Sequence, residues 1–133
     1  MIAKSGKGTS AYRHENRDHS LLVQIFLWEK DIDNAWREAK AGGCYDEQWL
    51  TLADKRAATH PADSLPIYKK EAETQIARMG NESYRAAAQR LRKIHELMER
   101  MNESAGFNRY VAELRLKHKP KRNFIKLLDQ ATW

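Results

Sequence analysis

The segment 95–99 has the sequence His-Glu-Leu-Met-Glu, which differs at one position from the H-E-x-x-H motif of zinc proteases. Glu99 stands where the motif has its second histidine, and a carboxylate is also a zinc ligand. A metal-dependent hydrolase built on His95 and Glu99 is therefore one hypothesis. His95 also borders the apolar positions Leu91 and Ile94, and a histidine packed at the margin of a core is the far commoner arrangement. We expect the structural role, with no metal and no cofactor bound.

The chain has a single cysteine, Cys44, which follows Gly42-Gly43. One cysteine excludes an intrachain disulfide and a cysteine-based zinc site within one chain. A catalytic cysteine needs a nearby histidine, and the sequence places none beside it. We expect a partly buried structural cysteine in a protein of the reducing cytoplasm.

The first residues offer two weaker candidates for chemistry. His14 and His19 could share a metal only if that segment were ordered, and the sequence suggests no third ligand. The segment 6–9 (Gly-Lys-Gly-Thr) superficially resembles a phosphate-binding loop, but it lacks the G-x-x-x-x-G-K-[ST] spacing and a preceding strand. Residues 1–14 have no apolar period, which predicts a disordered lead-in or an expression remnant. Together these segments argue against an enzyme.

Length and composition predict one helical domain over residues 15–133. Charged residues make up 32% of the 133 residues, and there are only six glycines and three prolines. This balance favours helices over sheets. The longest apolar run, 21–28, is interrupted by Gln24 and is far shorter than the roughly 20 residues of a membrane span. The N-terminus does not resemble a secretory signal.

Three helices are expected before residue 60. The first runs from about Asp18 to Trp28, with Leu22, Ile25 and Phe26 at the spacing of a buried face. The second follows a cap at residue 31 and ends at the glycine pair 42–43. The third begins at residue 45 or 46 and ends before the proline at 61.

The longest apolar stripes belong to a helical hairpin over residues 60–101. The Gly-Asn pair 80–81 ends its first helix and connects it to the second. Its expected buried positions are Leu65, Tyr68, Ala72, Ile76, Met79, Tyr84, Ala87, Ala88, Leu91, Ile94, Met98 and Met101. A sixth helix opens near residue 104 or 108, and a short seventh follows Pro120. The pattern predicts an all-α fold of about seven antiparallel helices, stacked in pairs as an α-solenoid with a right-handed superhelix.

The net charge of +6 is confined to one part of the chain. Residues 1–60 carry nine basic and nine acidic side chains, whereas residues 61–133 carry fifteen and nine. Most of the excess positive charge falls in residues 109–126, which contain seven basic residues and one acidic residue, Glu113. The seven are Arg109, Arg115, Lys117, Lys119, Lys121, Arg122 and Lys126. They are candidates for contacts to phosphates or to an acidic protein, and a solvated helix end is the alternative.

Two families resemble this chain. The segment 30–35 is similar to the inter-helix turn of tetratricopeptide repeats, with Asp31 and Ala35 in place and Lys30 instead of glycine. The turn at 80–81 also matches, but Arg85 occupies the place of a small alanine. The chain is therefore tetratricopeptide-like without being a faithful array.

The second resemblance is to the C-terminal helical region of bacterial SWIM zinc-finger proteins, over roughly residues 20–129. The similar phrases are 25–29 Ile-Phe-Leu-Trp-Glu, 35–39 Ala-Trp-Arg-Glu-Ala, 42–44 Gly-Gly-Cys, 60–61 His-Pro with 65–68 Leu-Pro-Ile-Tyr, and 119–128 Lys-Pro-Lys-Arg-Asn-Phe-Ile-Lys-Leu-Leu. The family's own Cys-x-Cys and Cys-x-His zinc motif is absent, so no metal ligand is implied. The resemblance implies a scaffolding or partner-binding role beside the zinc finger.

These observations favour a non-enzymatic helical-repeat scaffold that binds a protein or peptide on its concave side, accessory to a SWIM zinc-finger protein. Trp28 lies off the expected stripe of its helix and is a candidate interface aromatic. The alternative is a nucleic-acid-contacting module that uses residues 109–126. No membrane partner is expected. The oligomeric state stays open, although a bare outer face on the first helix would favour self-association.

Overall fold

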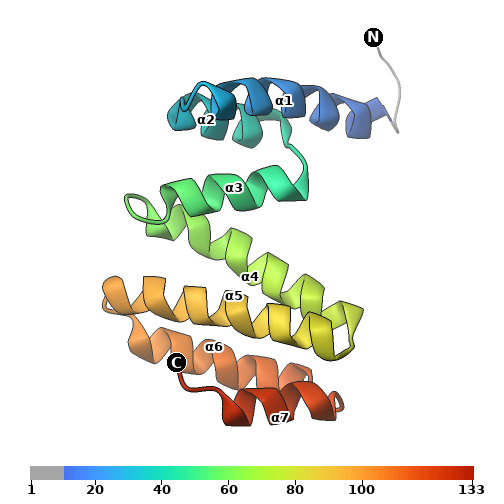
Figure 1. The fold of residues 1–133 in the computed structure, drawn as a ribbon, viewed down its shortest axis with the longest axis vertical. Helices are drawn as coiled ribbons and strands as arrows, with labels where there is room; N and C mark the ends of the chain where they lie inside the picture. Colours follow the sequence, from blue (N-terminus) through green and yellow to red (C-terminus); the bar gives the residue numbers. More distant parts are fainter. Residues whose placement is uncertain (1–10) are drawn as a thin grey trace. The chain divides into compact units, whose positions relative to one another are not determined.

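The structure, a computed structural model, describes residues 11–133, and their side chains from His19 onward. Seven helices and no strand occur in this part of the chain, which confirms the predicted all-α fold (Figure 1). They are α1 (Ala11–Trp28), α2 (Ile32–Gly42), α3 (Asp46–Arg56), α4 (Pro61–Arg78), α5 (Asn81–Arg100), α6 (Ser104–Lys117) and α7 (Arg122–Gln130). None of these helices is both long and apolar enough to cross a membrane.

The chain divides into two compact units, which we call the N-terminal unit, up to Ala58, and the C-terminal unit, Thr59–Trp133. The boundary nearly coincides with the residue at which the charge becomes basic. The expected lead-in, 1–14, lies outside the described residues as far as residue 10, and residues 11–14 already belong to α1. The single domain over 15–133 stays a prediction.

In the N-terminal unit, α1 packs along α2, and α3 contacts both. The core consists of Val23, Ala35, Ala39 and Leu52, each at most 1% exposed. Two alanines on α2 let the helices approach closely, while Trp36 and Trp49 cover the core with their rings edge to face, 5.7 Å between centroids.

The predicted buried face of α1 is wrong at two of its three residues, whereas the third, Phe26, packs against the core as expected. Val23 points into the core, whereas Leu22 and Ile25 are 43% and 42% exposed. The helix also begins at Ala11, not near Asp18. Residues 21–23 and 25–28 are apolar almost all round the helix, so their period does not select one face. Contact with α2 and α3 makes that selection.

The predicted ends of α2 are confirmed. The Asp31 carboxylate accepts a hydrogen bond from the backbone N–H of Asn34 at 3.2 Å, which satisfies a free donor of the first turn. Gly43 follows the helix with φ of 82°, a conformation that glycine adopts at little cost.

In the C-terminal unit, α5 is the central helix, and it contacts α4, α6 and α7 (Figure 1). The fully buried side chains of this unit include Tyr68, Ile76, Leu91, Ile94, Phe107 and Phe124. The hairpin α4–α5 therefore forms around the predicted apolar stripes.

Three expected core positions of the hairpin differ from the prediction. Met79 is 56% exposed because it ends α4 in a left-handed conformation with φ of 64°. Ala88 and Met101 are half-buried, whereas Leu97 is buried. Because α5 has neighbours on more than one side, its buried face is wider than one stripe.

Candidate functional site

A row of exposed apolar side chains runs along α1, and we call it the α1 stripe. It consists of Leu21, Leu22, Ile25 and Trp28, which are 67%, 43%, 42% and 83% exposed. Spacings of four and seven residues place Leu21, Ile25 and Trp28 on one face, opposite Val23. Large apolar side chains grouped on one exposed face mark an interaction site more often than single ones do.

A groove of about 680 Å³ lies at one end of the α1 stripe, between α1 and the start of α3. Its lining residues are Ser20, Leu21, Gln24, Tyr45, Asp46, Glu47 and Gln48. Leu21 thus belongs to both the groove and the α1 stripe, so the two surfaces are continuous.

Gln48 fixes the groove by joining its two walls. Its buried amide nitrogen donates to the backbone carbonyl of Ser20 at 2.9 Å and lies 3.3 Å from the Gln24 Oε1. Its Oε1 accepts from the backbone N–H of Tyr45 at 3.0 Å, at the start of α3. Because these bonds hold α1 against the first turn of α3, the groove is a fixed feature of the N-terminal unit.

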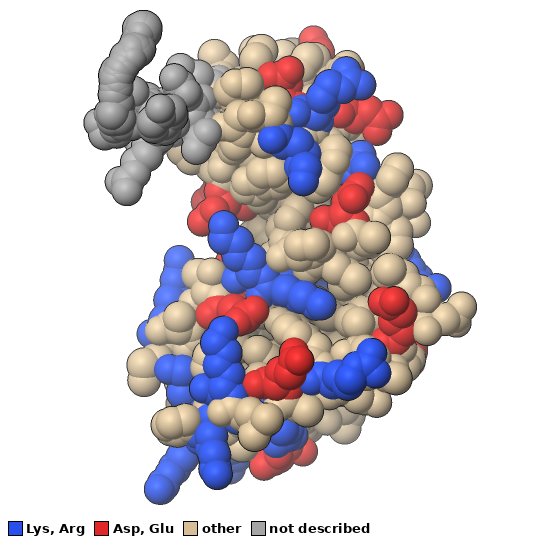
Figure 2. Space-filling model, turned by 180° about the vertical axis from the view of Figure 1, so that it is seen from behind, with Lys and Arg blue, Asp and Glu red and all other residues tan. Residues whose placement is uncertain are grey.

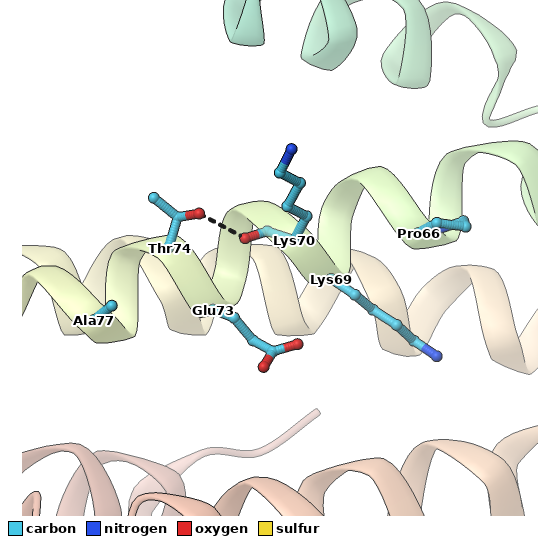
Figure 3. A pocket seen from close by; sticks show the side chains of 6 residues that line it. All are labelled: Pro66, Lys69, Lys70, Glu73, Thr74 and Ala77. Carbon is cyan, nitrogen blue, oxygen red and sulfur yellow. Dashed lines mark hydrogen bonds between the residues drawn. The ribbon is translucent and has the colours of Figure 1, made fainter. Parts of the chain in front are cut away.

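A second hollow, of about 500 Å³, lies along α4 (Figure 3). Its lining residues are Pro66, Lys69, Lys70, Glu73, Thr74 and Ala77. The Lys69 ammonium lies 4.8 Å from the ring centroid of Tyr110, and Glu73 accepts from the Lys117 ammonium at 2.8 Å. Figure 3 shows Lys70 pointing away from Lys69 and Glu73. Lys69 and Glu73 are thus both engaged with side chains of α6.

The seven predicted cations of residues 109–126 do not act alike. Arg115 donates to Asp129 at 2.6 Å, and Lys117 donates to Glu73 at 2.8 Å. Both acids lie outside the basic stretch, so the sequence alone could not reveal these pairs.

The other five cations have no carboxylate within ion-pair distance in the described part of the chain, and we call them the cationic patch. They are Arg109, Lys119, Lys121, Arg122 and Lys126. Figure 2 shows Lys and Arg side chains gathered over the C-terminal unit on the face drawn. Lys121 caps α7 without a side-chain hydrogen bond, so positive charge gathers where the helix dipole is also positive.

Beside this patch, His118 is buried and ends α6. Its ring meets the Phe124 ring edge to face at 5.9 Å, and its Nε2 has no hydrogen-bond partner among the described residues. Burial lowers the pKa of His118 below its ordinary value, and Lys117 and Lys121 lower it further. His118 stands between two lysines in the sequence, and no local pattern there indicates that its ring is buried.

The candidate zinc ligands form a packing contact. His95 lies 4.9 Å from the Phe107 ring centroid and 3.5 Å from the Glu99 carboxylate. No group of three potential metal ligands occurs among the described residues. His19 bonds to Glu38 at 3.2 Å, while His14 lies among the residues whose side chains are not described.

Cys44 is half-buried against the core of the N-terminal unit, as predicted. Burial and, to a smaller extent, the Asp46 carboxylate together raise the pKa of its thiol to about 11. A nucleophilic cysteine needs the opposite shift, so Cys44 is protonated and unreactive near neutral pH.

Comparison with known proteins adds no relative from which a role could be carried over to either surface. The resemblance to the SWIM-associated region therefore stays a prediction. No family model matches the sequence, and no curated protein and no solved structure matches it either.

Proposed function

We propose that this chain is a non-enzymatic helical scaffold that binds a protein partner through the α1 stripe. The exposure of Trp28, 83%, in line with Leu21 and Ile25 is the observation that carries the proposal. Apolar area of this kind gains free energy when a partner removes it from water, and tryptophan is enriched among the residues that dominate binding. The groove beside Leu21 adds shape to the surface.

The experiment compares proteins that co-purify with the wild-type chain and with a Leu21→Ser/Trp28→Ser variant. We expect a stoichiometric partner that the double variant loses. A matched control, Met79→Ser/Leu116→Ser, removes two exposed apolar side chains of the C-terminal unit and should retain that partner. An identical set of proteins on all three chains would contradict the proposal.

We further propose that the helices continue the pairwise, tetratricopeptide-like stacking that their short connections favour, and that the partner belongs to a SWIM zinc-finger system in the cytoplasm. The resemblance over residues 20–129 supports this assignment. Sequencing upstream of the coding region tests it, because a SWIM zinc-finger segment in the same reading frame is the expected finding. A neighbourhood without such a segment would count against the assignment.

A second function, contact with nucleic acid, is favoured by the cationic patch. Five cations without carboxylate partners are free to bind phosphates, and each phosphate contact makes the affinity more salt-dependent through counterion release. Three exposed members of the patch can be replaced together in Lys119→Gln/Arg122→Gln/Lys126→Gln.

Titration of duplex and single-stranded DNA and RNA at low and moderate salt tests this function. The triple variant should reduce the salt slope by roughly one unit for each phosphate contact it removes. A matched variant, Arg85→Gln/Arg92→Gln/Lys93→Gln, removes three exposed cations of α5 and should leave the slope unchanged. Equal effects of the two variants would indicate attraction by net charge alone.

A further inference from the structure

We propose that the partner of the α1 stripe presents an amphipathic helix with basic residues at both ends of its apolar face. This inference rests on the proposed function and names the chemistry of the partner. Leu21, Ile25 and Trp28 are separated by four and three residues along α1 and span about 10 Å. A partner helix of two to three turns, with apolar residues at similar spacing, matches such a row.

Carboxylates stand at both ends of the α1 stripe. At one end, Asp46 and Glu47 line the groove together with Leu21. At the other end, Glu29 follows Trp28, and its backbone N–H bonds to the carbonyl of Ile25 at 3.0 Å. This helical bond places Glu29 one turn beyond Ile25, on the same side of α1.

These three carboxylates are exposed and available to a partner. Within the described residues, none of them has a Lys, Arg or His nitrogen within 4.0 Å. The two polar residues that α1 contributes to the groove, Ser20 and Gln24, carry no charge. The surface is therefore apolar in the middle and acidic at its ends.

The charge pattern selects one occupant over the alternatives. In an antiparallel pairing of two copies, Glu29 would face Asp46 and Glu47 of the other copy, and a parallel pairing would set each acidic end against itself. Both arrangements place like charges together, which opposes association. The same carboxylates repel nucleic acid and anionic lipid. A helix with basic ends complements both the apolar row and the acidic ends.

Selection from a phage-displayed library of helical peptides, with the complete chain as the target, tests this inference. Enriched peptides are then synthesised, and their dissociation constants are measured by fluorescence anisotropy at two salt concentrations. We expect amphipathic peptides with net positive charge. Their affinity should fall at least about tenfold for Trp28→Ser, because tryptophan anchors carry much of such binding energies.

Neutralising the acidic ends in Glu29→Gln/Asp46→Asn/Glu47→Gln should weaken the same peptides by roughly 3- to 10-fold, since each exposed pair contributes modestly. Leu116→Ser, which removes an exposed leucine of α6, should leave the affinity unchanged. Higher salt should reduce the affinity for the wild-type chain more than for the neutralised variant.

The possible failures are distinguishable. Uncharged or acidic peptides that still require Trp28 would overturn the basic partner and leave the proposed function standing. Peptides that bind Trp28→Ser as tightly as the wild-type chain, or no enrichment at all, would overturn both. A concentration-dependent dimer in sedimentation, lost in Trp28→Ser, would make a second copy the occupant and so reject the basic helix.

Discussion

The two units of this protein treat apolar surface and charge in opposite ways. Five of the seven large apolar side chains exposed in the described part of the chain belong to the N-terminal unit, which has as many acidic as basic residues. The C-terminal unit buries its apolar residues around α5 and holds the whole charge excess. The contrast teaches that two all-helical units of one chain can present different chemistry: the first an apolar row, the second a cationic patch.

The largest effect is expected in the C-terminal core. Leu91→Ala should lower the free energy of unfolding by about 2–5 kcal/mol, because the buried side chain would leave a cavity in the centre of α5. Urea unfolding followed by circular dichroism measures the loss. Leu116→Ala, on an exposed position, serves as the control, and equal losses in both variants would erase the distinction between core and surface.

A moderate effect is expected where α1 meets α2. A Cβ added at Gly42 would overlap the ring of His19, so Gly42→Ala should cost about 1–3 kcal/mol through overpacking. Thermal unfolding measures the change. The double variant Gly42→Ala/His19→Ala should recover part of the loss, because it removes the overlapping ring. The loss of stability in the double variant should be smaller than the sum of the losses in the two single variants. A larger loss than that sum would show that the strain does not come from the His19 ring.

A pH-dependent effect is expected in the C-terminal unit from His118. Its pKa is lowered by burial and by neighbouring lysines, so the unfolded chain binds a proton first as the pH falls. Stability should therefore be greatest above the ordinary histidine pKa and should decline as the pH drops below it. Unfolding midpoints at pH 7.5 and 5.5 should differ less in His118→Leu than in the wild-type chain. His60→Gln, at an exposed position, should retain the full difference.

The smallest effect is expected on the α1 stripe. Trp28→Ser should change the free energy of unfolding by less than about 0.5 kcal/mol, because its side chain is mostly in water. Chemical unfolding of this variant, run beside Trp49→Ser, would show whether the exposed and the packed indole differ. A large loss of unfolding free energy in Trp28→Ser would show that the α1 stripe contributes to the stability of the fold, and the contrast between the two units would then disappear.

The sequence by itself determined the secondary structure and most of the core of the C-terminal unit. Helix formers, the cap at Asp31 and the glycine at 43 act through neighbouring residues, so their effect is visible along the chain. The apolar period of α5 likewise selected Leu91 and Ile94, since polar residues occupy its other faces.

Tertiary structure alone decided which face of α1 is buried and which cations are free. Leu22, Val23 and Ile25 are equally apolar, and only contact with α2 and α3 buries Val23 and exposes the other two. Lys117 forms an ion pair with Glu73, which lies 44 positions away in the sequence. Burial and ion pairing of this kind depend on neighbours that are distant in sequence, which local patterns do not record. The exposed apolar row on α1 and the choice of paired cations therefore follow from the fold and not from the local period of the sequence.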